Sequence, residues 1–220
     1  MTTETYPVGI IGGTPVDAQM GVHYFRLQGV ESVGIGISDS PEEATTLQVL
    51  HPLKLQRLVV DEVLRMKQKH QIASVCIYCN SLSAAINTVE VAEETGIQIV
   101  TPLDVYRQTA HLYEKVGLLA ANCQSLRGIE KAFKESNDNV QIIGTATLSL
   151  VTAIENNTDP ELILQEQGLI HLLRFFEASG VSALILGCTH FPYLQKVIEA
   201  HTSLQIIDPS AEMVNLVQSG

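Results

Sequence analysis

The sequence repeats itself with a period of about half its length. An apolar run at 8–11 is followed by two glycines, and a second run at 116–119, offset by 108 residues, is followed by two alanines. From residue 53 to residue 90 the offset becomes 109 without a gap, and both halves end on similar motifs, IQIVTP and LQIIDP. A fixed offset indicates a structural duplication, although any two α/β halves share some ordinary resemblance. We therefore expect two halves with the same fold.

Within each half, short β-branched runs alternate with longer amphipathic stretches, a pattern typical of βαβ units on a parallel sheet. Leu55, Val59, Val63 and Met66, for example, would form one apolar stripe along a helix. The predicted fold class is therefore α/β, with two pseudo-symmetric, doubly wound parallel-sheet domains. Strands are expected at 7–11, 33–37, 73–79, 97–100, 115–120, 140–144, 182–187 and 204–207, and helices near 55–69, 84–94, 163–178 and 193–200.

The two predicted lobes divide the chain unevenly. Residues 1–100 plus 208–220 are assigned to the first lobe, which carries Cys79, and residues 101–207 to the second, which carries Cys188. Sheets of this type bind ligands just outside the carboxyl ends of their strands. Because two such units facing each other would enclose a ligand from both sides, the active site is expected in the cleft between the lobes.

Charge and hydropathy argue against two classes of partner. Thirteen Lys and Arg side chains against 24 Asp and Glu give a formal net charge of −11, which would repel a phosphate backbone. No apolar run is long enough to span a bilayer, and the opening MTTETYPVG lacks the basic and apolar regions of a secretory signal. We expect a cytoplasmic protein that binds neither nucleic acid nor membrane.

Two of the four cysteines occupy equivalent places in the two halves. Cys79 ends the third predicted strand of the first half, Cys188 ends the third strand of the second half, and a helix follows each. A thiol in that position faces unpaired backbone N–H groups and the positive end of a helix dipole, which lower its pKa. Thiolate is therefore expected at neutral pH. Cys76 is predicted to be a small buried apolar residue, and Cys123 to pack rather than to line the cleft.

Two thiols that face one ligand from opposite lobes favour one reaction. One thiolate can remove a proton from carbon while the other thiol returns a proton to the opposite face, which inverts the stereochemistry. This two-base reaction requires neither a cofactor nor a metal, and none is predicted. The segment GIIGG at 9–13 lacks the third glycine of a dinucleotide fingerprint.

Polar residues beside the two cysteines have both a structural and a functional interpretation. Asn80, Ser81 and Thr189 suit helix N-caps, and could instead bind a substrate carboxylate. His190 could make only a backbone hydrogen bond, or could take part in the chemistry.

Other candidates are weaker. The motif CIYC at 76–79 could be a redox pair or half of a zinc site, but residues three apart on a strand point to opposite faces. Asp17 and Glu155 are carboxylates near strand ends, yet solvated loop or helix positions explain them at least as well.

Three motifs carry a family resemblance. LGCTHFPYL at 186–194 looks like the second cysteine motif of glutamate racemases, YCNSLSAA at 78–85 like the first, and GIIGGTP at 9–15 like the opening of aspartate racemases. The chain thus resembles the cofactor-independent aspartate/glutamate racemase superfamily along nearly its whole length. The resemblance implies a homodimer acting on a small acidic amino acid, with Cys79 and Cys188 as the two bases. It also implies that His190 assists the second cysteine. The substrate contacts that it implies are Gly13, Thr14, Asn80, Ser81 and Thr189.

The chain also departs from the family pattern. Glutamate racemases have an acidic residue after the first strand, where this chain has Gly12 and Gly13. Many members have threonines where this chain has Ala121 and Gln124, so one carboxylate contact is expected to be either missing or replaced by Asn122. The predicted function is a cofactor-independent amino-acid racemase for aspartate or glutamate. The alternatives are a catalytically silent two-lobed binding protein for a small dicarboxylate or amino acid, and a related isomerase or decarboxylase.

Overall fold

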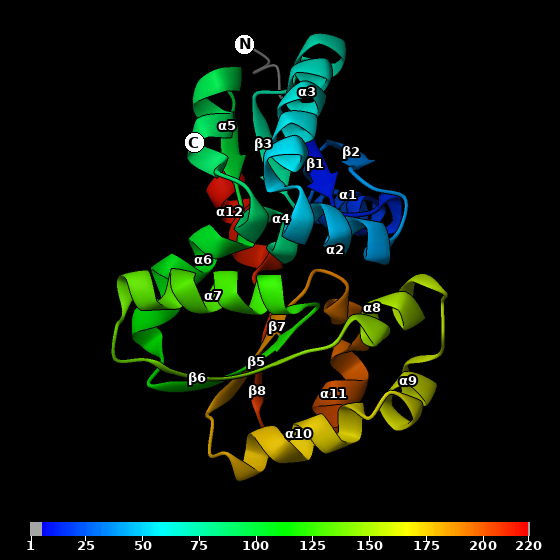
Figure 1. Ribbon diagram of the computed structural model, residues 1–220, viewed down its shortest axis with the longest axis vertical. Helices are drawn as coiled ribbons and strands as arrows, with labels where there is room; N and C mark the ends of the chain where they lie inside the picture. The colour runs from blue at the N-terminus through cyan, green and yellow to red at the C-terminus, as the bar shows by residue number, and fades with distance from the viewer. Residues whose placement is uncertain (1–5, 220) are drawn as a thin grey trace.

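The computed structural model describes residues 6–219 and shows two α/β lobes stacked along the long axis of the molecule (Figure 1). Residues 1–5 and 220 lie outside the described residues, so the outermost parts of the predicted first lobe and most of the segment assessed for a secretory signal are not described. Within 6–219, no helix is both long and apolar enough to cross a membrane.

Each lobe is built on one parallel sheet of four strands, which confirms the predicted fold class. The strand order is β2-β1-β3-β4 in the first lobe and β6-β5-β7-β8 in the second, so the two topologies are the same. The duplication extends to the strand register, since Gly9 pairs with Val75 and the equivalent Gly117 pairs with Leu184. The strands are β1 Val8–Gly12, β2 Ser32–Gly36, β3 Ser74–Ile77, β4 Gln98–Val100, β5 Lys115–Ala120, β6 Gln141–Ala146, β7 Ala183–Gly187 and β8 Gln205–Ile207.

Helices cover both faces of each sheet and bury an apolar cluster on every face. The predicted stripe of Leu55, Val59, Val63 and Met66 is buried against the first sheet. The first-lobe helices and the helix that follows β4 are α1 Pro15–Leu27, α2 Pro41–Leu50, α3 Pro52–His70, α4 Asn80–Ala85, α5 Thr88–Thr95 and α6 Pro102–Thr109. The remaining helical segments are η1 Ala110–Leu112, α7 Cys123–Ser136, α8 Leu148–Glu155, α9 Pro160–Glu166, α10 Leu169–Ala178, η2 Phe191–Leu194, α11 Gln195–His201 and α12 Ser210–Gln218.

Helix α12 packs beside the first sheet at the end of the described chain. Its residues Met213, Val214 and Val217 belong to the same apolar cluster as Val8 and Ile10 of β1. This contact supports the assignment of 208–220 to the first lobe, but the exact lobe boundaries stay a prediction.

Three predicted helices differ from the structure. The helix expected at 84–94 is two helices, because Asn87 caps α5 with its own side chain, and the one expected at 163–178 is divided at Gly168, where φ is +72°. The helix expected at 193–200 begins as the 3₁₀ segment η2, with its proline in the first turn, and continues as α11.

The turn from β1 into α1 lies tightly against the end of β2, and this fixes the start of α1 at the cleft. A Cβ atom on Gly36 would lie 2.3 Å from the backbone nitrogen of Pro15, and one on Gly12 would lie 2.4 Å from that of Ala18. Only glycine permits such a close approach of backbone to backbone. Thr14 then caps α1 by accepting a hydrogen bond from the backbone N–H of Asp17 at 3.2 Å.

Candidate active site

A cavity lies between the lobes, at the carboxyl ends of the central strands β1, β3, β5 and β7. It holds about 320 Å³ of atom-free space, counting the part open to solvent. Its walls come from both lobes: Gly13, Thr14, Asp17, Pro41, Ala44, Thr45, Gln48, Cys79 and Ser81 from the first, and Ala121, Asn122, Leu148, Val151, Cys188 and His190 from the second.

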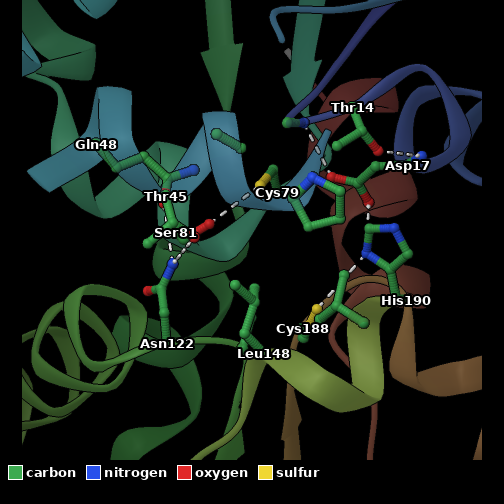
Figure 2. A pocket seen from close by; sticks show the side chains of 15 residues that line it. Thr14, Asp17, Thr45, Gln48, Cys79, Ser81, Asn122, Leu148, Cys188 and His190 are labelled. Atoms are coloured by element: carbon green, nitrogen blue, oxygen red, sulfur yellow. Dashed lines mark hydrogen bonds and ion pairs between the residues drawn. The ribbon is translucent and has the colours of Figure 1, made fainter. Parts of the chain in front are cut away.

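Cys79 and Cys188 enter this cavity from opposite lobes (Figure 2). Cys79 follows β3 and is the N-cap residue of α4, and Cys188 follows β7 directly. Both residues are buried, with 7% and 6% of their surface exposed. The structure therefore brings together the two thiols that the sequence placed at equivalent strand ends.

The environment of Cys79 corrects the expectation of an acidic thiol. Burial raises the pKa of Cys79 well above its ordinary value, and the nearby Asp17 carboxylate raises it further. The Ser81 hydroxyl, 3.4 Å from Sγ, and the Leu82 backbone N–H oppose this shift without reversing it. Cys79 is thus a thiol at neutral pH in this structure, because desolvation outweighs the effect of the short helix α4.

His190 lies beside Cys188 and makes polar contacts with both lobes. Its Nδ1 is 3.7 Å from Cys188 Sγ and 3.6 Å from Asp17 Oδ1, and its Nε2 is 2.9 Å from Glu155 Oε1. Burial lowers the pKa of His190, but Asp17, Cys188 and Glu155 together raise it well above 6.5. A protonated His190 stabilises negative charge on the sulfur next to it.

Asp17 is a buried member of this site, so its interpretation as a solvated residue was wrong. It is 1% exposed, and its Oδ2 accepts a hydrogen bond from the Gly13 backbone N–H at 3.0 Å. Its Oδ1 accepts a hydrogen bond from the Thr189 hydroxyl at 2.6 Å, across the cleft. The end of the first strand carries Gly12 and Gly13 in place of the acidic residue of glutamate racemases. In this chain Asp17 supplies a carboxylate from the first turn of α1.

Glu155 was likewise wrongly assigned to a solvated position. Its Oε1 accepts hydrogen bonds from the Thr14 hydroxyl at 2.5 Å and from His190, although it lies at the end of α8 in the other half of the sequence from Thr14. Burial raises the pKa of Glu155, but the hydrogen bonds from His190 and Thr14 lower it below the ordinary value. Asp17, Glu155 and His190 therefore form a charged cluster that joins the two lobes.

This cluster makes the folding stability depend on pH. Because the pKa of His190 is raised on folding, its contribution is complete below about pH 6.5 and is lost as pH rises through the folded pKa. Because the pKa of Glu155 is lowered, its contribution is present above about pH 4.5 and is lost as pH falls through the folded pKa. Denaturant unfolding measured as a function of pH should give the highest free energy of unfolding between about pH 4.5 and about pH 6.5. The free energy of unfolding should decrease at more acidic and at more alkaline pH. Between about pH 6.5 and about pH 8, below the ordinary pKa of the cysteine thiols, the decrease should be absent in His190→Gln, and its persistence in that interval would contradict the assignment.

Two predicted substrate contacts, Asn80 and Thr189, lie behind the cavity wall. The Thr189 hydroxyl donates a hydrogen bond to Asp17. Asn80 is 2% exposed, and its Oδ1 accepts a hydrogen bond from the Tyr106 hydroxyl at 2.9 Å. The Nδ2 atom of Asn80 is buried without a partner within residues 6–219. A buried donor without an acceptor is costly, so this amide is suited to a ligand or a water. Gly13, Thr14 and Ser81, by contrast, line the cavity as predicted.

Asn122 lines the cavity, but not as the free carboxylate contact that was expected. It caps α7 by accepting a hydrogen bond from the Ser125 backbone N–H at 2.9 Å. Its Nδ2 donates to Thr45 Oγ1 at 3.2 Å and to Gln48 Oε1 at 3.1 Å. Both amide protons of Asn122 are therefore donated to side chains of helix α2, and Asn122 orients Thr45 and Gln48.

The other two cysteines lie apart from the cavity. Cys76 is fully buried on the opposite face of the first sheet from Cys79, with Sγ 3.9 Å from Met213 Sδ, and burial raises its pKa. This placement contradicts a redox or zinc role for the CIYC motif. In the described part of the chain, no group of three or more His, Cys, Asp or Glu side chains is placed to hold a metal ion. Cys123 is exposed at the start of α7, so its predicted packing role is wrong.

Two duplicated α/β lobes enclose one cavity, and each lobe contributes one buried thiol to it. The protein is therefore of the two-domain α/β class with a cysteine pair in the interdomain cleft. The family model described as Asp/Glu/Hydantoin racemase matches residues 26–217. The chain therefore belongs to this family.

Individual relatives agree with the family assignment. The chain is 27% identical over 151 residues to the glutamate racemase of Limosilactobacillus reuteri (strain DSM 20016), an alignment that covers 66% of this chain and 56% of that protein. The alignment thus spans little more than half the length of that relative. A second relative, the glutamate racemase of Thermoanaerobacter sp. (strain X514), is 25% identical over 158 residues, which cover 69% of this chain and 58% of that protein.

Solved structures share the fold at low sequence identity. Glutamate racemase from Francisella tularensis subsp. tularensis SCHU S4, in complex with D-glutamate, superposes with a TM-score of 0.77 at 18% identity and covers 99% of this chain and 81% of that one. An aspartate racemase homologue from Pyrococcus horikoshii OT3 gives a TM-score of 0.68 at 14% identity, covering 97% of this chain and 99% of that one. These likenesses confirm the two-lobed fold.

Proposed function

We propose that this chain racemises an acidic amino acid, aspartate or glutamate, by a cofactor-independent reaction with two bases. The observation that carries the proposal is the placement of Cys79 and Cys188 on one cavity from opposite lobes. Membership of the racemase family and the similarity to named glutamate racemases support it. The homodimer and the cytoplasmic location implied at the sequence level stay predictions.

The charged groups around the two sulfurs favour different roles for the two cysteines. Burial and Asp17 disfavour negative charge on Cys79, which keeps its proton. His190, 3.7 Å from Cys188 Sγ and held by Glu155, favours negative charge on Cys188. In this proposal Cys79 therefore acts as the proton donor for one enantiomer, and Cys188, beside His190, acts as the base.

The reaction then follows in two proton transfers. The Cys188 thiolate takes the α-proton from one face of the substrate, leaving a carbanion conjugated with the α-carboxylate, and Cys79 gives its proton to the opposite face. The product has the inverted configuration, and the two cysteines have exchanged protonation states. The opposite enantiomer requires the opposite starting state, so both cysteines are needed for turnover in either direction. Polar groups suited to a zwitterion line the cavity, since Asp17 favours an ammonium group and the Ser81 hydroxyl can donate to the α-carboxylate.

The direct test is to incubate the purified chain with each enantiomer of aspartate and glutamate in deuterated water, and to follow optical purity by chiral chromatography and deuterium uptake by mass spectrometry. We expect loss of optical purity with one deuterium at Cα, unchanged by hydroxylamine, which scavenges pyridoxal phosphate, or by a metal chelator. Ligand-induced thermal stabilisation with no loss of optical purity for any of the four compounds would contradict the proposal and favour the binding-protein alternative.

A further inference from the structure

One end of the cavity carries a cluster of uncharged polar side chains that the proposed reaction does not use. Thr45 and Gln48 project from α2 of the first lobe, and Asn122 meets them from the second lobe. Figure 2 shows these three residues together on one side of the cavity, with Thr14, Asp17 and His190 on the other side. Gln48 is 4% exposed and lines the cavity wall.

The hydrogen bonds of this cluster fix the direction of both amides. A backbone N–H can only donate, so the atom of Asn122 that contacts Ser125 N at 2.9 Å is its oxygen. The Nδ2 of Asn122 must then face α2, where it donates to Gln48 and Thr45. Since Gln48 accepts through Oε1, its Nε2 is directed away from Asn122.

This arrangement leaves unused donors on two side chains that line this end of the cavity. Gln48 uses its oxygen on Asn122, and Thr45 uses a lone pair of Oγ1 on the same amide. In the range 6–219, no acceptor contacts Gln48 Nε2 or the Thr45 hydroxyl proton. A carboxylate only accepts hydrogen bonds, whereas a carboxamide presents an acceptor on one side and donors on the other. The oxygen atoms of Thr45 and Gln48 already accept hydrogen bonds from Asn122, and only their donors are unused. These two side chains therefore match a carboxylate better than an amide.

We propose that Thr45 and Gln48 form the subsite for the side-chain carboxylate of the substrate, oriented by Asn122, and that they set the preference for acidic over amide side chains. This inference rests on the proposed function and specifies its substrate. The opposite end of the cavity is lined by the Asp17 carboxylate, which attracts the ammonium group and repels a second carboxylate. The side chain of the substrate is thereby directed toward α2.

The α-carboxylate does not compete for this subsite. It is bonded directly to the reacting carbon, so it must lie within about one bond length of the atom on which the cysteines act. Ser81, whose Oγ is 3.4 Å from Cys79 Sγ, lines the cavity at that point. Neither Thr45 nor Gln48 contacts either sulfur, so the group they bind is the more distant carboxylate.

The test compares kcat/KM for aspartate and glutamate with that for asparagine and glutamine in Gln48→Glu, Thr45→Val and the matched control Thr46→Val. Gln48→Glu retains an acceptor for Asn122 but turns a carboxylate oxygen toward the substrate. We expect the ratio of acidic to amide kcat/KM to fall by about 100-fold, through KM for the acidic substrates, because a charged hydrogen bond is replaced by repulsion. Thr45→Val should lower the ratio by about 10-fold, and Thr46→Val, on the exposed side of α2, should leave it within about 2-fold.

The remaining outcomes overturn the inference in distinguishable ways. An unchanged ratio in both Gln48→Glu and Thr45→Val would show that α2 does not select the side chain. An equal loss for acidic and amide substrates would place the α-carboxylate at this end instead. If the parent chain racemises none of the four amino acids, the proposed function itself fails, and this inference fails with it.

Discussion

Cys79→Ala and Cys188→Ala are each expected to reduce racemisation of the proposed substrate by about 1000-fold or more. Each variant keeps only one of the two sulfurs on the cavity, and an intramolecular acid or base contributes about 100- to 10000-fold to a proton transfer. Inversion needs a base on one face and an acid on the other, so the second sulfur cannot replace the first. Racemisation rates in both directions, followed by chiral chromatography, measure the loss.

Two further variants make this result specific to the thiols at the cavity. Cys79→Ser and Cys188→Ser should remain strongly impaired, because a hydroxyl is a far weaker base than a thiol. Cys123→Ala is the matched control, since Cys123 is exposed and lies off the cavity, and it should keep activity within about 2-fold. Appreciable racemisation by either alanine variant at the cavity would contradict the two-base reaction.

His190→Ala is expected to lower the free energy of unfolding by about 3 to 5 kcal/mol near pH 6. The side chain of His190 is 5% exposed and lies between the carboxylates of Asp17 and Glu155. Removing one partner of a buried charged cluster leaves the other charges uncompensated, which costs that much in general. At this pH the imidazole is protonated in the folded protein, because its pKa is raised well above 6.5. Urea unfolding gives the difference directly.

A matched control and a second variant separate this effect from the loss of any histidine. His171 is exposed on α10 and makes no side-chain hydrogen bond or ion pair within residues 6–219, so His171→Ala should change the free energy of unfolding by less than about 0.5 kcal/mol. Adding Glu155→Gln to His190→Ala should recover part of the loss, since it removes one uncompensated carboxylate. A loss below about 1 kcal/mol in His190→Ala would show that the cluster does not hold the lobes together.

The parts of the fold that depend on hydrophobic pattern were predictable from the sequence. All eight strands were placed to within a few residues, because buried parallel strands are continuous apolar runs bounded by polar residues. The equivalence of Cys79 and Cys188 followed from the same pattern, since each ends a strand of the same rank. Helix breaks were missed where one residue decides them, as at Asn87, whose side chain caps α5, and at Gly168, which has a positive φ.

The polar part of the site depended on contacts between residues far apart in the sequence. Asp17 meets Thr189 across 172 positions and Glu155 meets Thr14 across 141, and no local pattern separates such carboxylates from solvated ones. Asn122 was predicted at the cavity, but its partners on α2 could not be known without the packing of the lobes. The thiol pKa of Cys79 was misjudged for a related reason, because the rule for helix N-termini omits burial.

Whether Cys79 and Cys188 act on opposite faces of one carbon can be measured by α-hydrogen exchange in the single-cysteine variants. Cys79→Ala and Cys188→Ala are incubated in deuterated water with each enantiomer of the substrate, at mildly alkaline pH, and deuterium at Cα is measured by mass spectrometry. A lone sulfur can remove a proton and return a deuteron only on its own face. We expect one variant to exchange only the D-enantiomer and the other only the L-enantiomer, both with retention of configuration. Exchange of the same enantiomer by both variants, or of both enantiomers by one, would contradict the two-base reaction.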